Sequence, residues 1–356
     1  MSTLKINLQV LKYNLEKLVN ISKLNSIEFV PIIKAFSNVD KILSILDIHA
    51  IKKVGLSRLK PLGQLKKFKQ KPDLICIALL DKKNYQEAFL KFDEIYLSSE
   101  LSLIHYINLA KSYPKKKQKL VFILDSGDHR EGLSSDSLLQ LIQSYHTKLP
   151  KNLSIEGIAT TFGCNLGLLP NETSFINLKL LVDKLESILL KKLSTVSVGG
   201  SIILKSILDE KLPKCITQIR VGEAFLLGTI PSYGIDHPDL NQKAFSFQTN
   251  LVELSEKPNF TGQSIGYDAL GNSVQINDKK TILQGILNFG LLDVDIMGLS
   301  PQSSKIKFCR QNSDYTMIEM NDNSYQLFDS FSFTLNYRAL AQALCSSFVE
   351  KQFYFE

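Results

Sequence analysis

Residues 28–35 read EFVPIIKA, a short run rich in β-branched side chains that ends in a single lysine, Lys34. A lysine that closes an apolar strand places a costly charge at the rim of the core. Either its flexible stem carries the amine to water, or the amine has a chemical role. Composition alone favours an amine that reaches water, whereas the segments that follow favour an amine with a chemical role.

Seven further apolar runs of strand length follow this stretch, at 52–57, 73–80, 94–99, 119–126, 154–161, 195–201 and 217–224. Segments with apolar residues at helical spacing separate them. Continuous apolar strands that alternate with helices are typical of a parallel sheet covered by helices. The number of strands favours a closed (β/α)8 barrel of the TIM type. An open doubly wound sheet is the alternative, but it would have a glycine-rich loop after the first strand, and residues 34–40 contain no glycine.

The alternation of strands and helices ends near residues 228–240, GTIPSYGIDHPDL, which are rich in turn-forming residues. Beyond them apolar residues recur with a period of two, and turn signals separate the segments. We therefore expect an α/β barrel over residues 9–232 and a mainly β C-terminal domain over residues 1–8 plus 233–356. The short alternating segment LKINL, residues 4–8, precedes the barrel and is expected to pair into the β domain.

Composition restricts the functional classes. The chain has 356 residues and a net charge of +7, and its lysine runs at 66–71 and 113–119 match no nucleic-acid-binding motif. We expect no nucleic-acid partner. Neither a long apolar window nor a signal-like N-terminus is present, which predicts a cytoplasmic protein without a membrane partner. The five cysteines lack metal-ligand spacing, so we expect reduced thiols and no metal site.

Polar residues gather where the predicted barrel strands end, and barrel active sites lie at that end. Lys34 ends the first strand, the fifth ends in DSGDHREG (125–132), and the eighth contains Arg220. The small residues 199–201, GGS, fit the phosphate site that barrels build after strands seven and eight. An amine, a phosphate-binding turn and several arginines together suggest a phosphorylated aldehyde cofactor, bound to the lysine as a Schiff base.

The order of the motifs IIKA, SGDHREG, EGIATTF, VGGS, RVGEAFLLG, SIGYD and NSDYTMIEM resembles the alanine racemase family of fold type III pyridoxal phosphate enzymes. The REG tripeptide, RVGEAFLLG and GLLDVDIMGLSP are similar to the ornithine racemase branch. The likeness extends from LKINL to LNYRALAQAL. It implies a cytoplasmic, homodimeric isomerase that interconverts L- and D-amino acids by two-base proton transfer at Cα. A basic amino acid such as ornithine or lysine is the expected small-molecule substrate.

The resemblance also implies roles for individual residues. Lys34 matches the lysine that binds pyridoxal 5'-phosphate and serves as one catalytic base, and Tyr267 matches the second base, contributed by the partner subunit. Arg130 matches the arginine that reaches the cofactor's phenolic oxygen or the substrate carboxylate, and Arg220 the one that faces the pyridine nitrogen. A fixed positive charge there keeps that nitrogen unprotonated, which suits racemisation better than transamination. The other matched positions are Ser201, Gly222 and Glu223 at the phosphate, Thr161 under the ring, and Asp314 in the loop that meets the substrate carboxylate.

Some positions depart from the family pattern. Asn38 and Ser347 stand where the family usually has tyrosines, Thr161 replaces a histidine, and Gly200 replaces an asparagine of the ornithine branch. The missing tyrosines argue against alanine as the substrate. The carboxylates that could bind a basic side chain instead are Glu131, Glu223, Asp268 and Asp314.

Two other functions stay open at this point. A pyridoxal phosphate-dependent lyase or aldolase on the same scaffold would need a metal near the substrate hydroxyl, and the scarcity of His and Cys pairs at the strand ends speaks against one. A noncatalytic pyridoxal phosphate-binding protein would not need the large β domain, which is expected to supply the second base.

Overall fold

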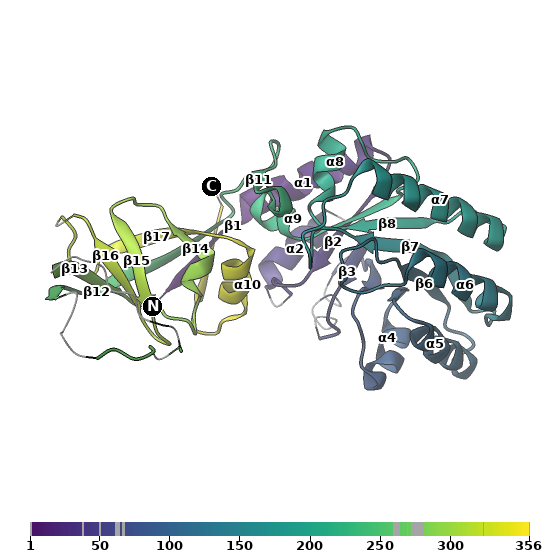
Figure 1. Ribbon diagram of the computed structural model, residues 1–356, viewed down its shortest axis with the longest axis horizontal. Helices are drawn as coiled ribbons and strands as arrows, with labels where there is room; N and C mark the ends of the chain where they lie inside the picture. The colour runs from purple at the N-terminus through teal and green to yellow at the C-terminus, as the bar shows by residue number, and fades with distance from the viewer. Residues whose placement is uncertain are drawn as a thin grey trace. The chain divides into compact units, whose positions relative to one another are not determined.

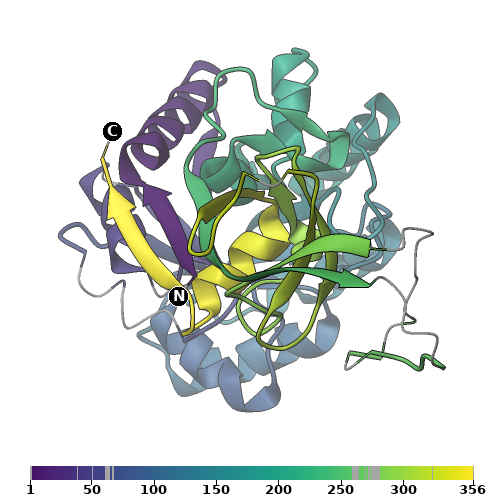
Figure 2. The same ribbon diagram turned by 90° about the vertical axis from the view of Figure 1, so that its left-hand side faces the viewer.

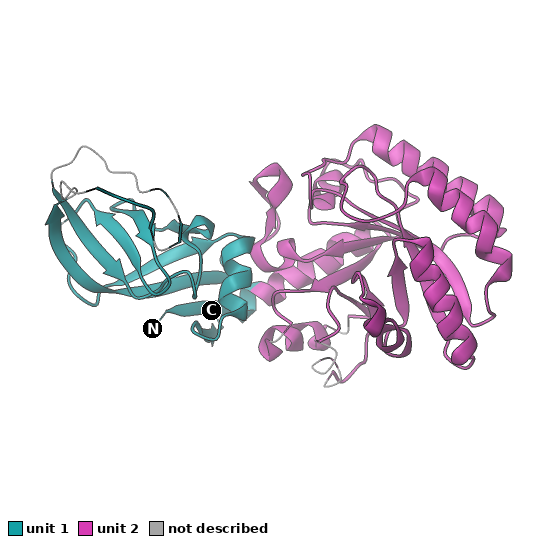
Figure 3. Cartoon of the chain, turned by 60° about the horizontal axis from the view of Figure 1, so that its bottom comes forward, with its two compact units in different colours: residues 1–10, 243–356 teal, residues 11–242 magenta. Residues whose placement is uncertain are grey.

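The computed structural model describes residues 2–355 apart from positions 38, 50, 61–64, 66–67, 259–263, 269, 272, 274–280 and 323. The chain divides into two compact units (Figure 3). Leu11–Gln242 form the first, which we call the barrel unit, and Met1–Val10 together with Lys243–Glu356 form the second, the β unit.

The barrel unit contains a closed barrel (Figure 1). Its strands are paired in the order β2 to β9. All neighbouring strands are parallel, and β9 closes the ring by pairing with β2, where Val30 lies opposite Arg220. The predicted barrel is therefore confirmed. Its strands are β2 (Glu28–Ile33), β3 (Lys53–Leu56), β4 (Asp73–Cys76), β5 (Glu94–Leu97), β6 (Gln118–Ile123), β7 (Leu153–Thr161), β8 (Thr195–Gly199) and β9 (Gln218–Val221).

Helices cover the outside of the barrel (Figure 1). Four of them follow a residue whose side-chain oxygen accepts a backbone N–H of the first turn, namely Asn7, Ser99, Ser134 and Asn171. One of the segments with predicted helical spacing between the apolar runs, residues 61–69, lies mostly outside the described residues. The helices of this layer are α1 (Leu8–Leu24), α2 (Asp40–Ile48), α4 (Tyr85–Lys91), α5 (Glu100–Ser112), α6 (Ser135–Tyr145), α7 (Glu172–Leu189), α8 (Ile203–Leu208) and α9 (Glu223–Leu227).

The barrel interior is filled by apolar side chains from alternate strand positions. Val30 and Ile32 of β2 pack with Tyr96 of β5 and with Val121 and Ile123 of β6. Burial of each such aliphatic side chain contributes roughly 1.5–3 kcal/mol. Because successive strand residues point to opposite faces, the residue after Ile33 continues the inward-facing series of β2.

The β unit is built on an eight-stranded sheet. The predicted pairing of LKINL is confirmed: β1 is antiparallel to β12 and parallel to β18, so strands from both ends of the chain lie side by side (Figure 2). Helix α10 (Tyr337–Cys345) also belongs to this unit. The strands are β1 (Thr3–Asn7), β12 (Phe245–Pro258), β13 (Thr281–Leu287), β14 (Leu299–Pro301), β15 (Ile306–Gln311), β16 (Thr316–Met320), β17 (Ser330–Leu335) and β18 (Glu350–Tyr354).

The boundary between the units falls at residue 243, after the predicted position of 233. The intervening segment is fastened to the barrel unit by hydrogen bonds. The side-chain amide of Asn14 donates to the carbonyl of Asn241 at 2.9 Å and its oxygen accepts the Asn241 backbone N–H at 2.8 Å. The turn residues after Gly228 therefore close the barrel unit.

Among the residues that the structure describes, no helix combines the length and apolar character needed to cross a membrane. The same residues include no group of three or more His, Cys, Asp or Glu side chains arranged to hold a metal ion.

Candidate active site

Lys34 directly follows β2 at the C-terminal end of the barrel. Its side chain is exposed, yet the surrounding protein removes part of the water from the amine. This desolvation lowers the pKa of the amine, and the positive charges of Arg130 and Arg220 act in the same direction. Cys164 and Glu131 oppose the shift. A lowered pKa leaves more of the amine neutral, which is the form that acts as a nucleophile or a base.

Arg220 lies inside the barrel with 6% of its surface exposed. Its Nη1 donates to Ser197 Oγ at 2.6 Å, and its Nη2 donates to the Thr160 carbonyl at 2.9 Å and to Thr161 Oγ1 at 3.1 Å. Burial lowers the pKa of Arg220, but a guanidinium ordinarily loses its proton only in strongly alkaline solution, so the group stays charged. The barrel thus holds a fixed cation near Lys34.

Gly199 gives the guanidinium its space. A Cβ at this position would lie 2.5 Å from Arg220 Nη2 and 3.0 Å from Thr161 Oγ1. Only a glycine allows β8 to pass this close to the arginine.

A chain of buried polar groups continues below Arg220 and holds it in place. Ser197 Oγ and the Tyr96 hydroxyl donate to Gln218 Oε1 at 2.6 and 2.8 Å, and Gln218 Nε2 donates to Glu28 Oε2 at 2.9 Å. Sequence reasoning missed Tyr96, Ser197 and Gln218. The available signal was their position, because each lies at an inward-facing place in a predicted strand.

Arg130 is engaged by three neighbours. Its Nε and Nη2 donate to the two carboxylate oxygens of Glu131, and its Nη1 donates to Cys164 Sγ at 2.9 Å. Nη2 also reaches Thr161 Oγ1 at 3.4 Å, so Thr161 contacts both arginines of the site. Burial tends to lower the pKa of Arg130, but the hydrogen bonds and charges of Glu131 and Cys164 raise it by more. Glu131, whose side chain is 10% exposed, was predicted only as a possible partner of a basic substrate side chain, and Cys164 had no predicted role.

Asp128 joins the two loops that carry Arg130 and Cys164. This carboxylate, 2% exposed, accepts the backbone N–H groups of Cys164 at 3.1 Å and Asn165 at 2.8 Å. It also accepts those of Leu166 at 3.2 Å and Leu168 at 3.4 Å. Hydrogen bonds to an ionised acceptor are the stronger kind. Asp128 therefore fixes the loop after β7 against the loop after β6.

The loop after β8 depends on two small residues. Gly200 has φ +105°, and a Cβ there would lie 2.8 Å from the Phe162 carbonyl oxygen. Next to it, Ser201 is buried and its Oγ accepts the backbone N–H of Ala224 at 2.9 Å. The serine proton stays available for donation to an acceptor such as a phosphate oxygen.

Glu223 begins α9, directly after Gly222 at the end of β9. β2 and β9 are neighbours, with Pro31 opposite Val221, so the start of α9 lies beside the end of β2 that carries Lys34. Burial raises the pKa of the half-buried Glu223 to about 7, and the charge of Lys34 partly opposes the shift. Within the described part of the chain this carboxyl has no hydrogen-bond or ion-pair partner.

The remaining predicted residues belong to the β unit or lie outside the described residues. Tyr267 is 79% exposed in the β unit, where it forms an isolated bridge with Ser273. Asp314 is exposed in the same unit, and its backbone N–H donates to Asn312 Oδ1 at 2.9 Å. Ser347 is also exposed there, and Asn38 lies outside the described residues. The roles expected for these residues stay predictions.

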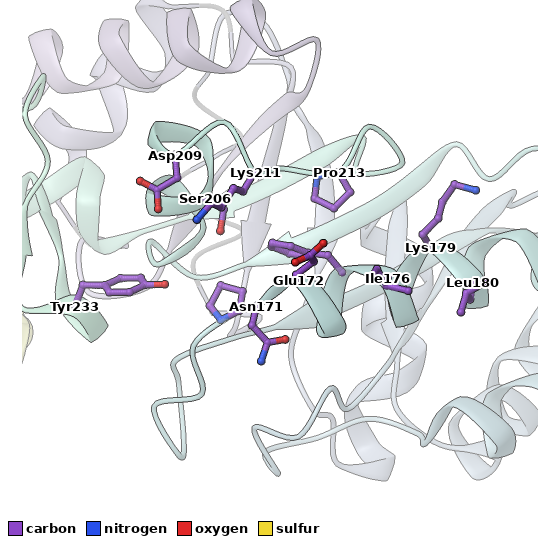
Figure 4. Close-up of a pocket in the computed structure, with 12 residues that line it drawn as sticks. Asn171, Glu172, Ile176, Lys179, Leu180, Ser206, Asp209, Lys211, Pro213 and Tyr233 are labelled. Carbon is purple, nitrogen blue, oxygen red and sulfur yellow. The ribbon is translucent and has the colours of Figure 1, made fainter.

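A groove of about 790 Å³ lies on the outer helix layer of the barrel unit, and none of the predicted site residues lines it (Figure 4). Its walls include Phe175 and Ile176 of α7, Ser206 of α8 and Tyr233. The grouping of amine, guanidinium and carboxyl side chains occurs instead at the strand ends around Lys34.

Comparison with known proteins agrees with this architecture. Residues 6–229 match the family described as alanine racemase, N-terminal domain. The ornithine racemase of Acetoanaerobium sticklandii is 30% identical over 350 residues, covering 98% of both chains. The lysine racemase of Thermotoga maritima is 27% identical over 349 residues, covering 98% of this chain and 97% of its own.

Solved structures show the same fold. The alanine racemase of Clostridium difficile 630 superposes with a TM-score of 0.75 at 17% identity, covering 100% of this chain and 96% of its own. The alanine racemase of Bartonella henselae, solved with covalently bound pyridoxal phosphate, gives a TM-score of 0.75 at 13% identity over 99% of both chains. With the family match across most of the barrel unit and a 30% identical relative over nearly the whole length, the chain belongs to the alanine racemase family.

Proposed function

We propose that the protein is a pyridoxal phosphate-dependent amino-acid racemase that acts on a basic amino acid such as ornithine or lysine. One observation carries the proposal: the amine of Lys34 has a lowered pKa beside two arginines at the open end of the barrel. The names of the two curated relatives, ornithine racemase and lysine racemase, support the reaction and the substrate class.

The donor set around Lys34 fits pyridoxal phosphate. A partly neutral amine suits covalent attachment to an aldehyde. The buried cation of Arg220 suits a neutral ring nitrogen, and Thr161, in contact with both arginines, belongs to the same wall. The hydroxyl of Ser201 and the backbone amides of Gly222 and Glu223 would hold the phosphate. Arg130 would meet the phenolic oxygen or the substrate carboxylate.

In the proposed reaction, bound pyridoxal phosphate supplies the conjugation that makes the substrate Cα proton acidic. Lys34 takes or returns that proton on one side, and its lowered pKa leaves more of the amine in the neutral form that a base needs. Tyr267 would act on the other side, from the partner subunit of a homodimer. Asp314 would lie in the loop that meets the substrate carboxylate. We further propose that this homodimer is cytoplasmic.

Arg220 determines the type of reaction. Because its charge is fixed and buried, it does not pass a proton to the ring nitrogen. The site therefore stabilises negative charge at Cα only weakly, which favours prompt return of the proton over transfer of the amino group.

Purified protein supplied with pyridoxal phosphate should show a visible absorbance band and remove the optical rotation of L-ornithine or L-lysine without releasing keto acid or aldehyde. The Lys34→Ala variant should lose the band and at least about 10²-fold in rate. Lys151→Ala changes an exposed lysine before β7 and serves as the matched control. Release of an aldehyde would indicate a lyase, and a band without turnover a cofactor carrier.

A further inference from the structure

Four carboxylates are candidates for contact with the basic end of the substrate, and the structure separates them. Glu131 uses both oxygens on Arg130. Asp314 already has a proposed role toward the substrate carboxylate, and Asp268 belongs to the β unit and not to the barrel unit that carries Lys34. Glu223 alone among the four lies at the barrel end that carries Lys34 without a partner in the described residues.

Glu223 is close enough to Lys34 for the two charges to influence each other. The strand register places them at neighbouring strand ends, since Pro31 of β2 is opposite Val221 of β9. The proposed function, however, engages the Lys34 amine in covalent binding and proton transfer. Among the described residues, Lys34 is the one cation whose charge acts on Glu223. When the Lys34 amine is bound covalently or gives up its proton, the Glu223 carboxylate is left without a neighbouring positive charge.

Burial of a carboxylate without a partner raises the free energy of the protein. A cation that binds beside the carboxylate lowers this free energy by forming a charge-assisted hydrogen bond. Ornithine and lysine carry such a cation, a few methylene groups from the Cα on which Lys34 would act. A neutral amino acid of the same length offers none, and its binding would leave the carboxyl unpaired.

We infer that Glu223 binds the distal ammonium group of a diamino-acid substrate and thereby selects diamino acids over neutral ones. This inference rests on the proposed racemase function. It makes Glu223 a specificity-determining residue. Its side chain would face the substrate, while its backbone amide would help to hold the cofactor phosphate.

The test compares substrates that differ only in the distal group. Racemisation of L-ornithine and L-norvaline, and of L-lysine and L-norleucine, would be measured with the cofactor-loaded wild type and the Glu223→Gln variant. The wild type should prefer the diamino acid of each pair. In the variant the ratio of kcat/KM within each pair should fall about tenfold or more, mainly through a higher KM for the diamino acid. Glu223→Asp should restore part of the preference.

A second measurement does not depend on turnover. Equilibrium dissociation constants for L-ornithine and L-norvaline, followed through the visible absorbance, should separate in the wild type and converge in the glutamine variant. Glu131→Gln is the matched control, because unpairing Arg130 should weaken both members of a pair together.

The outcomes are distinguishable. If the wild type racemises no amino acid, the proposed function fails. If it racemises L-ornithine and the glutamine variant keeps the same ratio, or weakens both members of each pair equally, the proposed function stands and the assignment of Glu223 is overturned.

Discussion

The guanidinium of Arg220 lies 5.1 Å from the centre of the Tyr96 ring inside the barrel. A cation over an aromatic face is stabilised by the ring, and more so where water is excluded. The Tyr96 ring thus packs against the arginine that would face the cofactor. The Tyr96 hydroxyl donates a hydrogen bond to Gln218 Oε1 at 2.8 Å, which holds the ring in this position.

Replacement of Tyr96 separates the ring from the hydroxyl. Tyr96→Phe keeps the ring and should cost about 1 kcal/mol of unfolding free energy for the lost hydrogen bond. Tyr96→Leu removes the cation–π contact as well and should cost about 2–4 kcal/mol, with a shift of the cofactor absorbance. Urea unfolding and visible spectra of both variants check this. Equal losses would show that the ring does not support Arg220.

Gly200→Ala tests the loop after β8. The Cβ would collide with the Phe162 carbonyl at 2.8 Å in a backbone of φ +105°, so we expect a loss of about 2–3 kcal/mol and weaker cofactor retention. Gly167→Ala is the control, because Gly167 also has positive φ, +68°, but no atom within 4 Å of the added Cβ. A thermal melt should show a larger decrease in Tm for the Gly200 variant, and similar decreases would contradict the collision.

Asp128→Asn tests the link between the two loops. The amide keeps one acceptor oxygen and turns an NH₂ group toward backbone N–H donors, so unfolding free energy should fall by about 1–3 kcal/mol. The loop bearing Cys164 should also loosen, and its exposed thiol should react faster with a disulfide reagent. Thiol kinetics in a variant whose other cysteines are serine would measure this. An unchanged rate would mean that the loop is held by other contacts.

The carboxyl of Glu223 predicts a pH dependence of stability. Its pKa rises from 4.5 in the unfolded chain to about 7 in the folded one, so the folded state binds the proton more tightly. The stability that this proton provides is full below pH 4.5 and lost as the pH rises through about 7. The wild type should therefore lose stability relative to Glu223→Gln across this window, as measured by urea unfolding at several pH values. Parallel profiles would contradict the raised pKa.

Much of the fold is predictable from the sequence because barrel strands are buried on both faces. Their apolar runs stand out, so the strand around Val30 and the run before Asp125 were located to within a few residues. The terminal segment LKINL was assigned to the β sheet from its alternation alone. The unit boundary was placed too early because turn residues mark loops, whereas hydrogen bonds such as those of Asn241 decide the unit to which a loop belongs.

The grouping of charged side chains in the candidate site was predictable where a charged residue coincides with a strand end. Lys34, Arg130 and Arg220 carry charges at such positions, and the structure gathers them at one end of the barrel. The pairing of Arg130 with Glu131 and Cys164 depends on how two loops fold back on each other, a geometry that local patterns do not encode.

The pairing of β1 with β18 has a consequence for synthesis. Thr3 lies opposite Glu350, so β1 leaves the ribosome more than three hundred residues before the strand that covers its parallel edge. All the barrel strands are available long before that moment. Barrel closure can thus precede completion of the β unit, and a nascent or C-terminally clipped chain exposes an unpaired edge at β1 that invites aggregation.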